Sequence, residues 1–216
     1  MESKRILLNI VLASTFAVLM GIFAQIKFYI GSVPYTMQNF ALVSAGLILE
    51  PKYALISQLI YLSLIAVGMP LGAGFRGGPT VLFGYTAGYL WAFPISCTLM
   101  SYLSKLYLKK SLFLSSHTSG RHVVILLLIS LVAIIPVYLL GFIVFFYYAI
   151  QPTALGIVLR SWSRKLVDSL GFSTMNETLI LFTASVLIFI PQDLLVDHIL
   201  AVLVATRVLR HLNYLK

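Results

Sequence analysis

Charge is scarce in this 216-residue chain, in which only 10% of residues are charged and Asp and Glu together number six. In soluble domains roughly a quarter of the residues are usually charged. The formal net charge of +9 would suggest nucleic-acid binding in a soluble protein. Here the basic residues lie at the ends of apolar runs, where they set membrane orientation instead. We therefore expect no nucleic-acid partner.

Cysteine and catalytic motifs are also scarce. The single cysteine, Cys97, excludes an intrachain disulfide and a cysteine metal site, and its apolar surroundings predict a small core residue. The chain has no nucleophile elbow, no paired histidines at zinc-protease spacing, no phosphate loop and no CxxC. The sequence thus indicates no enzyme, metal or cofactor, and any active transport would need an external source of energy.

Apolar residues are abundant: 60% of the chain is hydrophobic and the mean hydropathy is +1.01. The apolar runs are about 20 residues long, which suits spanning helices rather than the shorter strands of a barrel. We predict an all-α polytopic membrane protein, a six-helix transmembrane bundle that forms one integral domain over 1–216. The predicted helices cover about 6–26, 40–49, 53–68, 80–107, 122–150 and 191–209.

Two of these segments, 40–49 and 53–68, are shorter than the roughly 20 residues needed to cross a bilayer. Whether they cross or dip in and return is left open. The apolar run 178–190 is also short, so we expect it to pack on the bundle while Pro191 opens the last helix. The semi-polar run 151–177 suits an interfacial helix.

The charge distribution predicts the orientation. With six crossings and the N-terminus inside, ten of the 15 basic residues lie on the inner side, namely Lys4, Arg5, Lys52, Lys105, Lys109, Lys110, Arg121, Arg207, Arg210 and Lys216. Five lie outside, namely Lys27, Arg76, Arg160, Arg164 and Lys165. An inner excess favours a multi-pass protein of the cytoplasmic (inner) membrane with both termini in the cytoplasm.

The stretch 66–93 holds seven of the chain's 14 glycines and one cation, Arg76. Such glycine density marks backbone that bends sharply or lies close to another group. In the predicted orientation this stretch shares the outer side with two other polar regions, the loop around 36–39 and the start of the last helix. We expect these regions to form one outward-facing pocket, since small-molecule sites combine apolar walls with a few polar groups.

Two features leave alternatives open. Ala13, Ala17 and Gly21 recur every fourth residue, which favours close helix packing either within the bundle or against a separate subunit. Asp193 and Asp197, four residues apart, share a helix face. Asp193 suits a helix cap or a ligand contact, and Asp197 suits a salt bridge to Arg76 or a cation or proton site. With His198 they would also suit the acid and base of a membrane-embedded enzyme, but they fall short of a metal-ligand set.

Four segments resemble the BioY family, the biotin-specific substrate-binding (S) component of energy-coupling factor (ECF) transporters. They are residues 33–39 (VPYTMQN), 45–51 (AGLILEP), 84–93 (GYTAGYLWAF) and 189–195 (FIPQDLL), and they occur in the order typical of the family. The family has a lysine three residues after the motif aspartate, where this chain has Val196.

The resemblance implies a six-helix S component that captures biotin from outside and performs no covalent chemistry. Delivery would use an ECF scaffold membrane subunit and ATPase subunits in the cytoplasm. Ala13 and Ala17 match the family's scaffold-docking pattern, with Gly21 one turn further. On this basis we expect the biotin-binding residues to be Thr36, Gln38, Asn39, Arg76, Gly77, Gly78, Thr86, Gly88, Tyr89 and Asp193.

In this interpretation Arg76 replaces the family lysine as the partner of the biotin carboxylate, and the three glycines let backbone amides approach the ligand. Three alternatives remain at this point. They are another small vitamin-like ligand in the same fold, uptake without an energising partner, and the membrane enzyme based on Asp193, Asp197 and His198.

Overall fold

The computed structural model describes residues 2–30, 33–111, 120–172 and 174–214. Their elements in chain order are α1 (Glu2–Phe23), β1 (Lys27–Ile30), β2 (Val33–Thr36), α2 (Gln38–Ile48), α3 (Pro51–Ala66), α4 (Pro79–Leu82), α5 (Ala87–Ser111), α6 (Gly120–Ala133), α7 (Ile135–Ile150), α8 (Ala154–Ser169), α9 (Glu177–Phe182), the π-helical η1 (Thr183–Leu187), α10 (Ile190–Gln192), the π-helical η2 (Asp193–His198) and α11 (Ile199–Tyr214). The side chains of Lys4, Arg5, Lys109, Lys110 and Lys216, which contributed to the predicted orientation, lie outside the described part.

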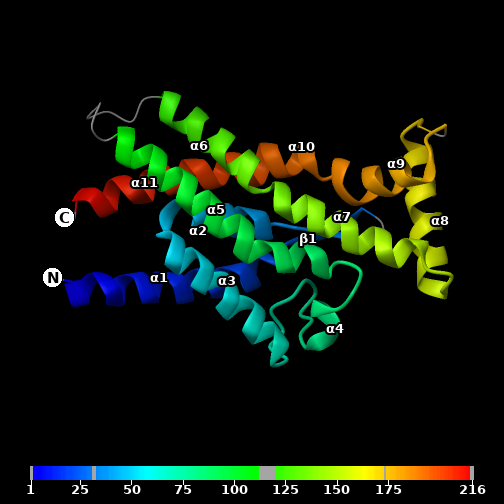
Figure 1. The fold of residues 1–216 in the computed structure, drawn as a ribbon, viewed down its shortest axis with the longest axis horizontal. Coiled ribbons are helices and arrows are strands. Elements are labelled where there is room, and N and C mark those ends of the chain that lie inside the picture. The colour runs from blue at the N-terminus through cyan, green and yellow to red at the C-terminus, as the bar shows by residue number, and fades with distance from the viewer. Residues whose placement is uncertain (1, 31–32, 112–119, 173, 215–216) are drawn as a thin grey trace.

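The fold is an elongated helical bundle, which confirms the all-α prediction. Six helical segments of the described chain form it: α1, α2, α3, α5, the pair α6–α7, and the run from α9 to α11. Within the same ranges, Ile6–Phe23, Gly120–Ile150 and Glu177–Arg210 are long and apolar enough to cross a membrane. The described ends of the chain lie at one end of the bundle, and α8 crosses the other end (Figure 1).

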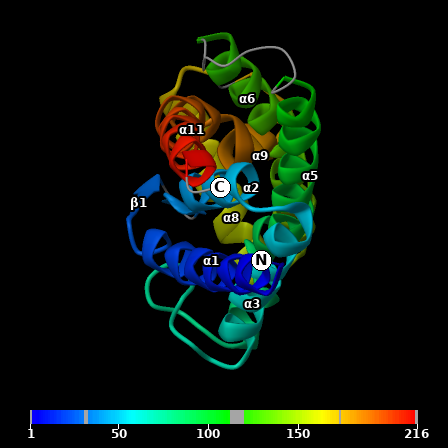
Figure 2. The same cartoon turned by 90° about the vertical axis from the view of Figure 1, so that its left-hand side faces the viewer.

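Helix α2 is the centre of the bundle. It packs against α1, α5 and α11, and its residues from Ala41 to Ile48 are all buried (Figure 2). A buried helix end needs partners for its free carbonyl groups. The Lys105 ammonium group donates to the carbonyl oxygens of Leu47 and Ile48, both at 2.9 Å, and Ser101 Oγ donates to Leu49 O at 2.6 Å. The carbonyl groups at the buried end of α2 thus have donors on α5.

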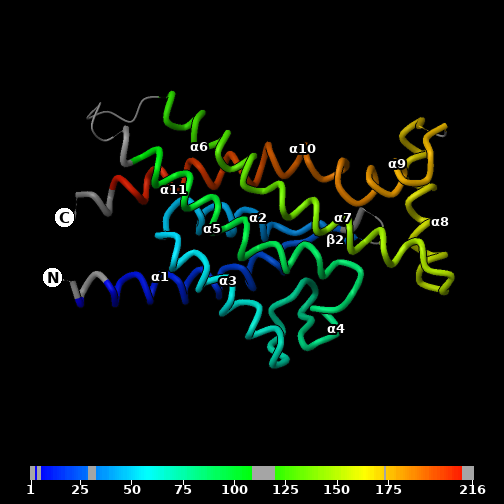
Figure 3. The backbone as a smooth tube through the Cα atoms, in the orientation of Figure 1, coloured from blue at the N-terminus to red at the C-terminus, as the bar shows by residue number. Residues whose placement is uncertain are grey.

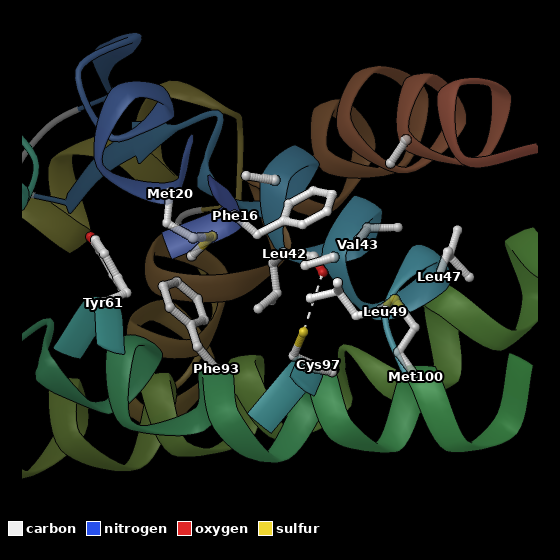
Figure 4. Packing of buried hydrophobic residues seen from close by; sticks show 14 of the residues in the cluster. Phe16, Met20, Leu42, Val43, Leu47, Leu49, Tyr61, Phe93, Cys97 and Met100 are labelled. Atoms are coloured by element: carbon white, nitrogen blue, oxygen red, sulfur yellow. Dashed lines mark hydrogen bonds between the residues drawn. The ribbon is translucent and has the colours of Figure 1, made fainter. Parts of the chain in front are cut away.

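The core around α2 contains Cys97, whose buried Sγ lies 3.7 Å from the carbonyl oxygen of Leu42 (Figure 4). This confirms the prediction of a small core cysteine. Ala13 and Ala17 are also fully buried in the chain itself, and a Cβ added at Gly21 would lie 2.6 Å from Leu71 Cδ2. In the isolated chain this face of α1 is covered by the chain's own residues. Docking of a separate subunit on this face stays a prediction.

The predicted helix over about 80–107 is wrong at its start. Gly78, with φ of 86°, precedes the single turn of α4, and the chain then breaks before α5 begins at Ala87. Backbone carbonyls freed in a membrane protein must find donors. Here Trp91 Nε1 donates to Leu82 O at 2.8 Å and the Tyr148 hydroxyl donates to Phe83 O at 2.5 Å.

Prolines change two other predicted helices. The apolar stretch over 122–150 is interrupted at Ile134, two residues before Pro136. Pro191 lies in the first turn of α10, as predicted. Helical residues already precede it from Glu177, however, with a turn at Ile188 and Phe189, and the helical path continues into α11 (Figure 3). Proline cannot donate to the carbonyl four residues earlier. The chain accommodates Pro191 with π-helical turns on both sides, η1 and η2.

The connection between α1 and α2 forms an antiparallel hairpin that the sequence analysis missed. In β1 and β2, Lys27 pairs with Thr36 and Phe28 with Tyr35. The rings of Phe28 and Tyr35 stack with their centroids 4.8 Å apart. The Tyr35 ring also stacks on the ring of Phe189, with a centroid distance of 6.0 Å. The hairpin thus places Tyr35 against the last helical run.

Candidate functional site

A cavity of about 290 Å³ lies where β2, the start of α2, the Arg76 loop, the α4–α5 break, α7 and the run of η1 to η2 meet. This volume is at the small end of the roughly 300–1,000 Å³ typical of small-molecule sites. The structure brings seven of the predicted binding residues to its wall: Thr36, Gln38, Asn39, Arg76, Thr86, Tyr89 and Asp193.

The other three predicted residues, Gly77, Gly78 and Gly88, are not among the residues that line the cavity. A Cβ at Gly77 would lie 2.3 Å from Met69 O, so this glycine lets the loop fold on itself. Gly78 has a positive φ and is the N-cap residue of α4. A Cβ at Gly88 would lie 2.1 Å from Leu140 O, so this position lets α5 approach α7. The structure gives these glycines packing and turn roles in place of ligand approach.

Asp193 is the most enclosed charged group of the cavity, with 1% of its surface exposed. Its Oδ2 accepts hydrogen bonds from Asn39 Nδ2 at 2.9 Å and from the Tyr138 hydroxyl. Its Oδ1 has no donor among the described residues. Asp193 begins η2 within the long helical run, so it is not the N-terminal cap that one alternative envisaged. A buried carboxylate oxygen without a donor favours a ligand that supplies an N–H or O–H.

Asp197 and His198 are buried but do not line the cavity. Asp197 Oδ2 accepts a hydrogen bond of 2.9 Å from the Tyr35 hydroxyl, where a salt bridge to Arg76 had been an alternative. His198 Nδ1 lies 2.8 Å from Ser130 Oγ, and its Nε2 lies 3.8 Å from Asp193 Oδ2. The described residues contain no cluster of three or more His, Cys, Asp or Glu side chains that could hold a metal.

A chain of hydrogen bonds joins the hairpin to the glycine-rich loop. Thr36 Oγ1 donates to Gln38 Oε1 at 2.9 Å, and Gln38 Nε2 donates to the Tyr61 hydroxyl at 2.6 Å. Tyr61 in turn donates to Leu71 O at 3.1 Å. Gln38 is therefore fixed before any ligand arrives, which favours recognition by a rigid wall.

Tyr89 forms a wall whose position depends on glycine. Its hydroxyl donates to Ser185 O at 2.5 Å, and its ring lies over Gly141. A Cβ at Gly141 would lie 2.2 Å from Tyr89 Cε1, which real atoms do not tolerate. The absence of a side chain at Gly141 therefore makes room for the aromatic ring.

Arg76 lies at the rim of the cavity and is exposed. It ends a tight turn that begins at Gly72, with Gly72 N donating to Arg76 O at 2.8 Å. No carboxylate among the described residues pairs with its side chain. The site thus has a buried carboxylate at one end and a free cation at its rim.

The sequence analysis missed several wall residues, listed here as Tyr35, Tyr85, Phe93, Val137, Tyr138, Ser185 and Phe189. A tyrosine inside an apolar span, two residues after Pro136, was the available signal for Tyr138. Tyr35, Tyr85, Phe93 and Phe189 lay inside the quoted motifs. Val196, at the position of the family lysine, is not among the wall residues.

Comparisons with known proteins agree on one family. The sequence profile of the BioY family matches residues 1–214. The chain is 47% identical over 85 residues to a probable biotin transporter BioY of Pyrococcus horikoshii, covering 39% of this chain and 52% of that protein. It is 49% identical over 69 residues to a probable biotin transporter BioY of Bacillus subtilis, covering 32% and 37%. The matched parts thus span about half and about a third of these relatives.

A biotin transporter BioY of Thermotoga maritima is 30% identical over 116 residues, with 54% of this chain and 69% of that protein covered. Among solved structures, the chain resembles the S component for biotin from an ECF-type ABC transporter. That match has a TM-score of 0.70 at 23% identity and covers 97% of this chain and 95% of the other, so the two share a fold. The profile match over nearly the whole chain shows that the protein belongs to the BioY family.

Proposed function

We propose that this protein is the biotin-binding component of a vitamin uptake system and that the cavity beside Asp193 holds biotin. The observation that carries the proposal is the buried Oδ1 of Asp193, which lacks a donor among the described residues and belongs to a cavity wall. Biotin offers the matching chemistry, since its ureido group carries N–H donors. The family relatives named biotin transporters support the same ligand.

The two ends of biotin suit the two ends of the site. The fused ring would lie against Tyr89 and Phe189, with its ureido edge toward Asp193 and the polar groups of Asn39, Gln38 and Thr36. The valerate carboxylate would reach Arg76 at the rim. A hydrogen bond to a charged group contributes about 1.5–3 kcal/mol, or roughly tenfold or more in affinity.

The protein acts in this proposal as a capture subunit in the cytoplasmic membrane, with both termini in the cytoplasm and the cavity open outward. An ECF scaffold subunit and ATPase subunits would energise release on the inner side, because the chain has no nucleotide-binding motif of its own. Since Ala13, Ala17 and Gly21 are buried in the chain itself, scaffold contacts by way of this face would require α1 to move.

The enzyme alternative has less support. Asp197 and His198 are 0% and 1% exposed and do not line the cavity, so a substrate held there would not touch them. The alternative of another vitamin-like ligand rests on Val196 in place of the family lysine. Because Val196 is not among the residues that line the described cavity, this replacement gives little support for a different ligand.

The test is competitive binding on the purified chain in lipid nanodiscs. We expect saturable binding of radiolabelled biotin, which excess unlabelled biotin displaces and thiamine or riboflavin does not. Displacement by another vitamin would favour the alternative ligand, and absence of saturable binding would overturn the proposal. Uptake by biotin-requiring cells, with and without the ATPase subunits, tests the need for an energising partner separately.

A further inference from the structure

We infer that Gln25 is a positioning residue that holds the Arg76 turn over the cavity. Gln25 follows the last helical residues of α1 and does not line the cavity itself. Its side-chain amide nevertheless reaches the far side of the glycine-rich loop, about fifty positions along the chain. This inference rests on the proposed function, in which Arg76 binds the ligand carboxylate.

The Gln25 amide makes three hydrogen bonds that together fix the turn to α1. Nε2 donates to Gly72 O and to Gly21 O, both at 3.0 Å. Oε1 accepts from the backbone N–H of Phe75 at 2.8 Å. Both amide hydrogens are therefore used, and the amide contacts the turn at its first residue and at the residue before Arg76.

The turn needs such support because its own backbone conformation is unfavourable. Gly74 has φ of 76° and Phe75 has φ of 56°, a region that residues with a side chain rarely adopt. Phe75 is also 72% exposed, so packing of its ring does not hold the turn. Apart from the pairing of Gly72 with Arg76, the hydrogen bonds that residues 72–76 make within the described part of the chain go to Gln25. A strained conformation persists only where its surroundings enforce it.

The position of Arg76 follows from the geometry of this turn. Gly72 and Arg76 bond to each other, and Gly72, Ala73 and Arg76 all belong to the cavity wall. When Gln25 releases Gly72 O and Phe75 N–H, the turn loses the contacts that aim its cation at the cavity. The affinity for the carboxylate end of the ligand should then fall, while contacts around Asp193 stay unchanged.

The test compares biotin with biotinamide, in which the carboxylate is replaced by a neutral amide. Arg76→Ala should weaken biotin binding about tenfold or more and leave biotinamide binding nearly unchanged. Gln25→Ala should weaken biotin binding by a smaller factor with the same selectivity, and the double variant should bind biotin no more weakly than Arg76→Ala. Gln151→Ala, a change to a glutamine outside the cavity, is the matched control and should bind both ligands normally.

A second measurement does not depend on the ligand. In the ligand-free protein, trypsin cleavage after Arg76, followed by mass spectrometry of the fragments, should be about fivefold faster in Gln25→Ala than in wild type or in Gln151→Ala, since local opening limits cleavage. If Arg76→Ala weakens biotin and biotinamide equally or not at all, the carboxylate assignment is wrong and cleavage alone decides the role of Gln25. Unchanged cleavage, or equal loss of both ligands in Gln25→Ala, would overturn the inference.

Discussion

The side-chain amide of Asn39, at the start of α2, donates a hydrogen bond of 2.9 Å to Oδ2 of Asp193, which lies 154 positions further along the chain. This contact ties the central helix of the bundle to the π-helical turn η2. Together with the Tyr138 hydroxyl, it occupies one oxygen of the carboxylate, and the other oxygen has no donor within the described part of the chain. The carboxylate is thereby oriented before a ligand binds, which lowers the cost of binding.

The first prediction concerns Tyr138. Tyr138→Phe removes one of the two donors to Asp193 Oδ2 and keeps the ring. We expect biotin affinity to fall severalfold, because the Asp193 carboxylate is then less well oriented before the ligand binds. Isothermal titration of the purified variant measures this. Tyr147→Phe, an exposed tyrosine on the same helix, is the control, and equal affinities in the two variants would refute the role of Tyr138.

The second prediction concerns the space above Gly141. Gly141→Ala places a methyl group against the Tyr89 ring, so either the ring or α7 must shift. Overpacking of this kind typically costs about 1–3 kcal/mol. We expect a lower melting temperature and weaker biotin binding. Gly120→Ala is the control because a Cβ there meets no atom within 4 Å. A Gly141→Ala protein that melts and binds like wild type would show that Tyr89 does not depend on this glycine.

The third prediction separates internal packing from scaffold docking on α1. Ala17 is 0% exposed, whereas its neighbour Val18 is 50% exposed. Ala17→Trp should therefore lower the melting temperature and biotin binding together, and Val18→Trp should leave both unchanged. Thermal melting and biotin titration of the isolated subunit compare these two variants with the wild type. If Ala17→Trp binds biotin normally but no longer co-purifies with a scaffold subunit, the face acts in docking.

The fourth prediction concerns Tyr35 and its dependence on pH. Tyr35→Phe removes the hydroxyl that donates to Asp197 Oδ2, which should destabilise the protein by about 1–3 kcal/mol. Burial raises the pKa of the Tyr35 phenol, so the wild-type hydroxyl stays protonated in the folded state. Above the unfolded-state pKa of about 10, the unfolded chain loses the Tyr35 proton while the folded protein keeps it. The free energy of unfolding therefore falls as the pH rises above about 10 and is unaffected by this group at lower pH.

The stability difference between wild type and Tyr35→Phe should therefore be constant at neutral pH and narrow above about pH 10. Thermal melting across this range measures it, with the exposed Tyr102→Phe as control. A difference that widens with increasing pH would contradict this sign.

The sequence predicted those features that depend on composition and local pattern. Long apolar runs predicted a helical membrane bundle, and the polar groups at Asn39, Arg76, Thr86 and Asp193 were correctly expected to meet in one place. That expectation rested on topology, because loops and helix ends on the same side of a bilayer lie near one another.

Features that depend on tertiary contacts could not be predicted from the sequence. Pro191 lies in the first turn of α10, yet the sequence did not show that helical turns precede it or that the π-helical segments η1 and η2 flank it. Gly88 resembles a ligand-contacting glycine, yet the backbone of Leu140 occupies the space beside it. The spacing of Ala13 and Ala17 showed that one face of α1 carries small side chains, but it did not show which part of the chain or which subunit covers that face.

Equilibrium dialysis of radiolabelled biotin against the purified chain, its Asp193→Asn variant and the Asp168→Asn control tests the central claim most directly. Asp168 lies on α8, is exposed and does not line the cavity. The account predicts saturable binding to one site in the wild type and in Asp168→Asn, and a loss of about tenfold or more in Asp193→Asn. Equal binding to all three proteins would contradict the assignment of the cavity, and no saturable binding to the wild type would contradict the proposed function.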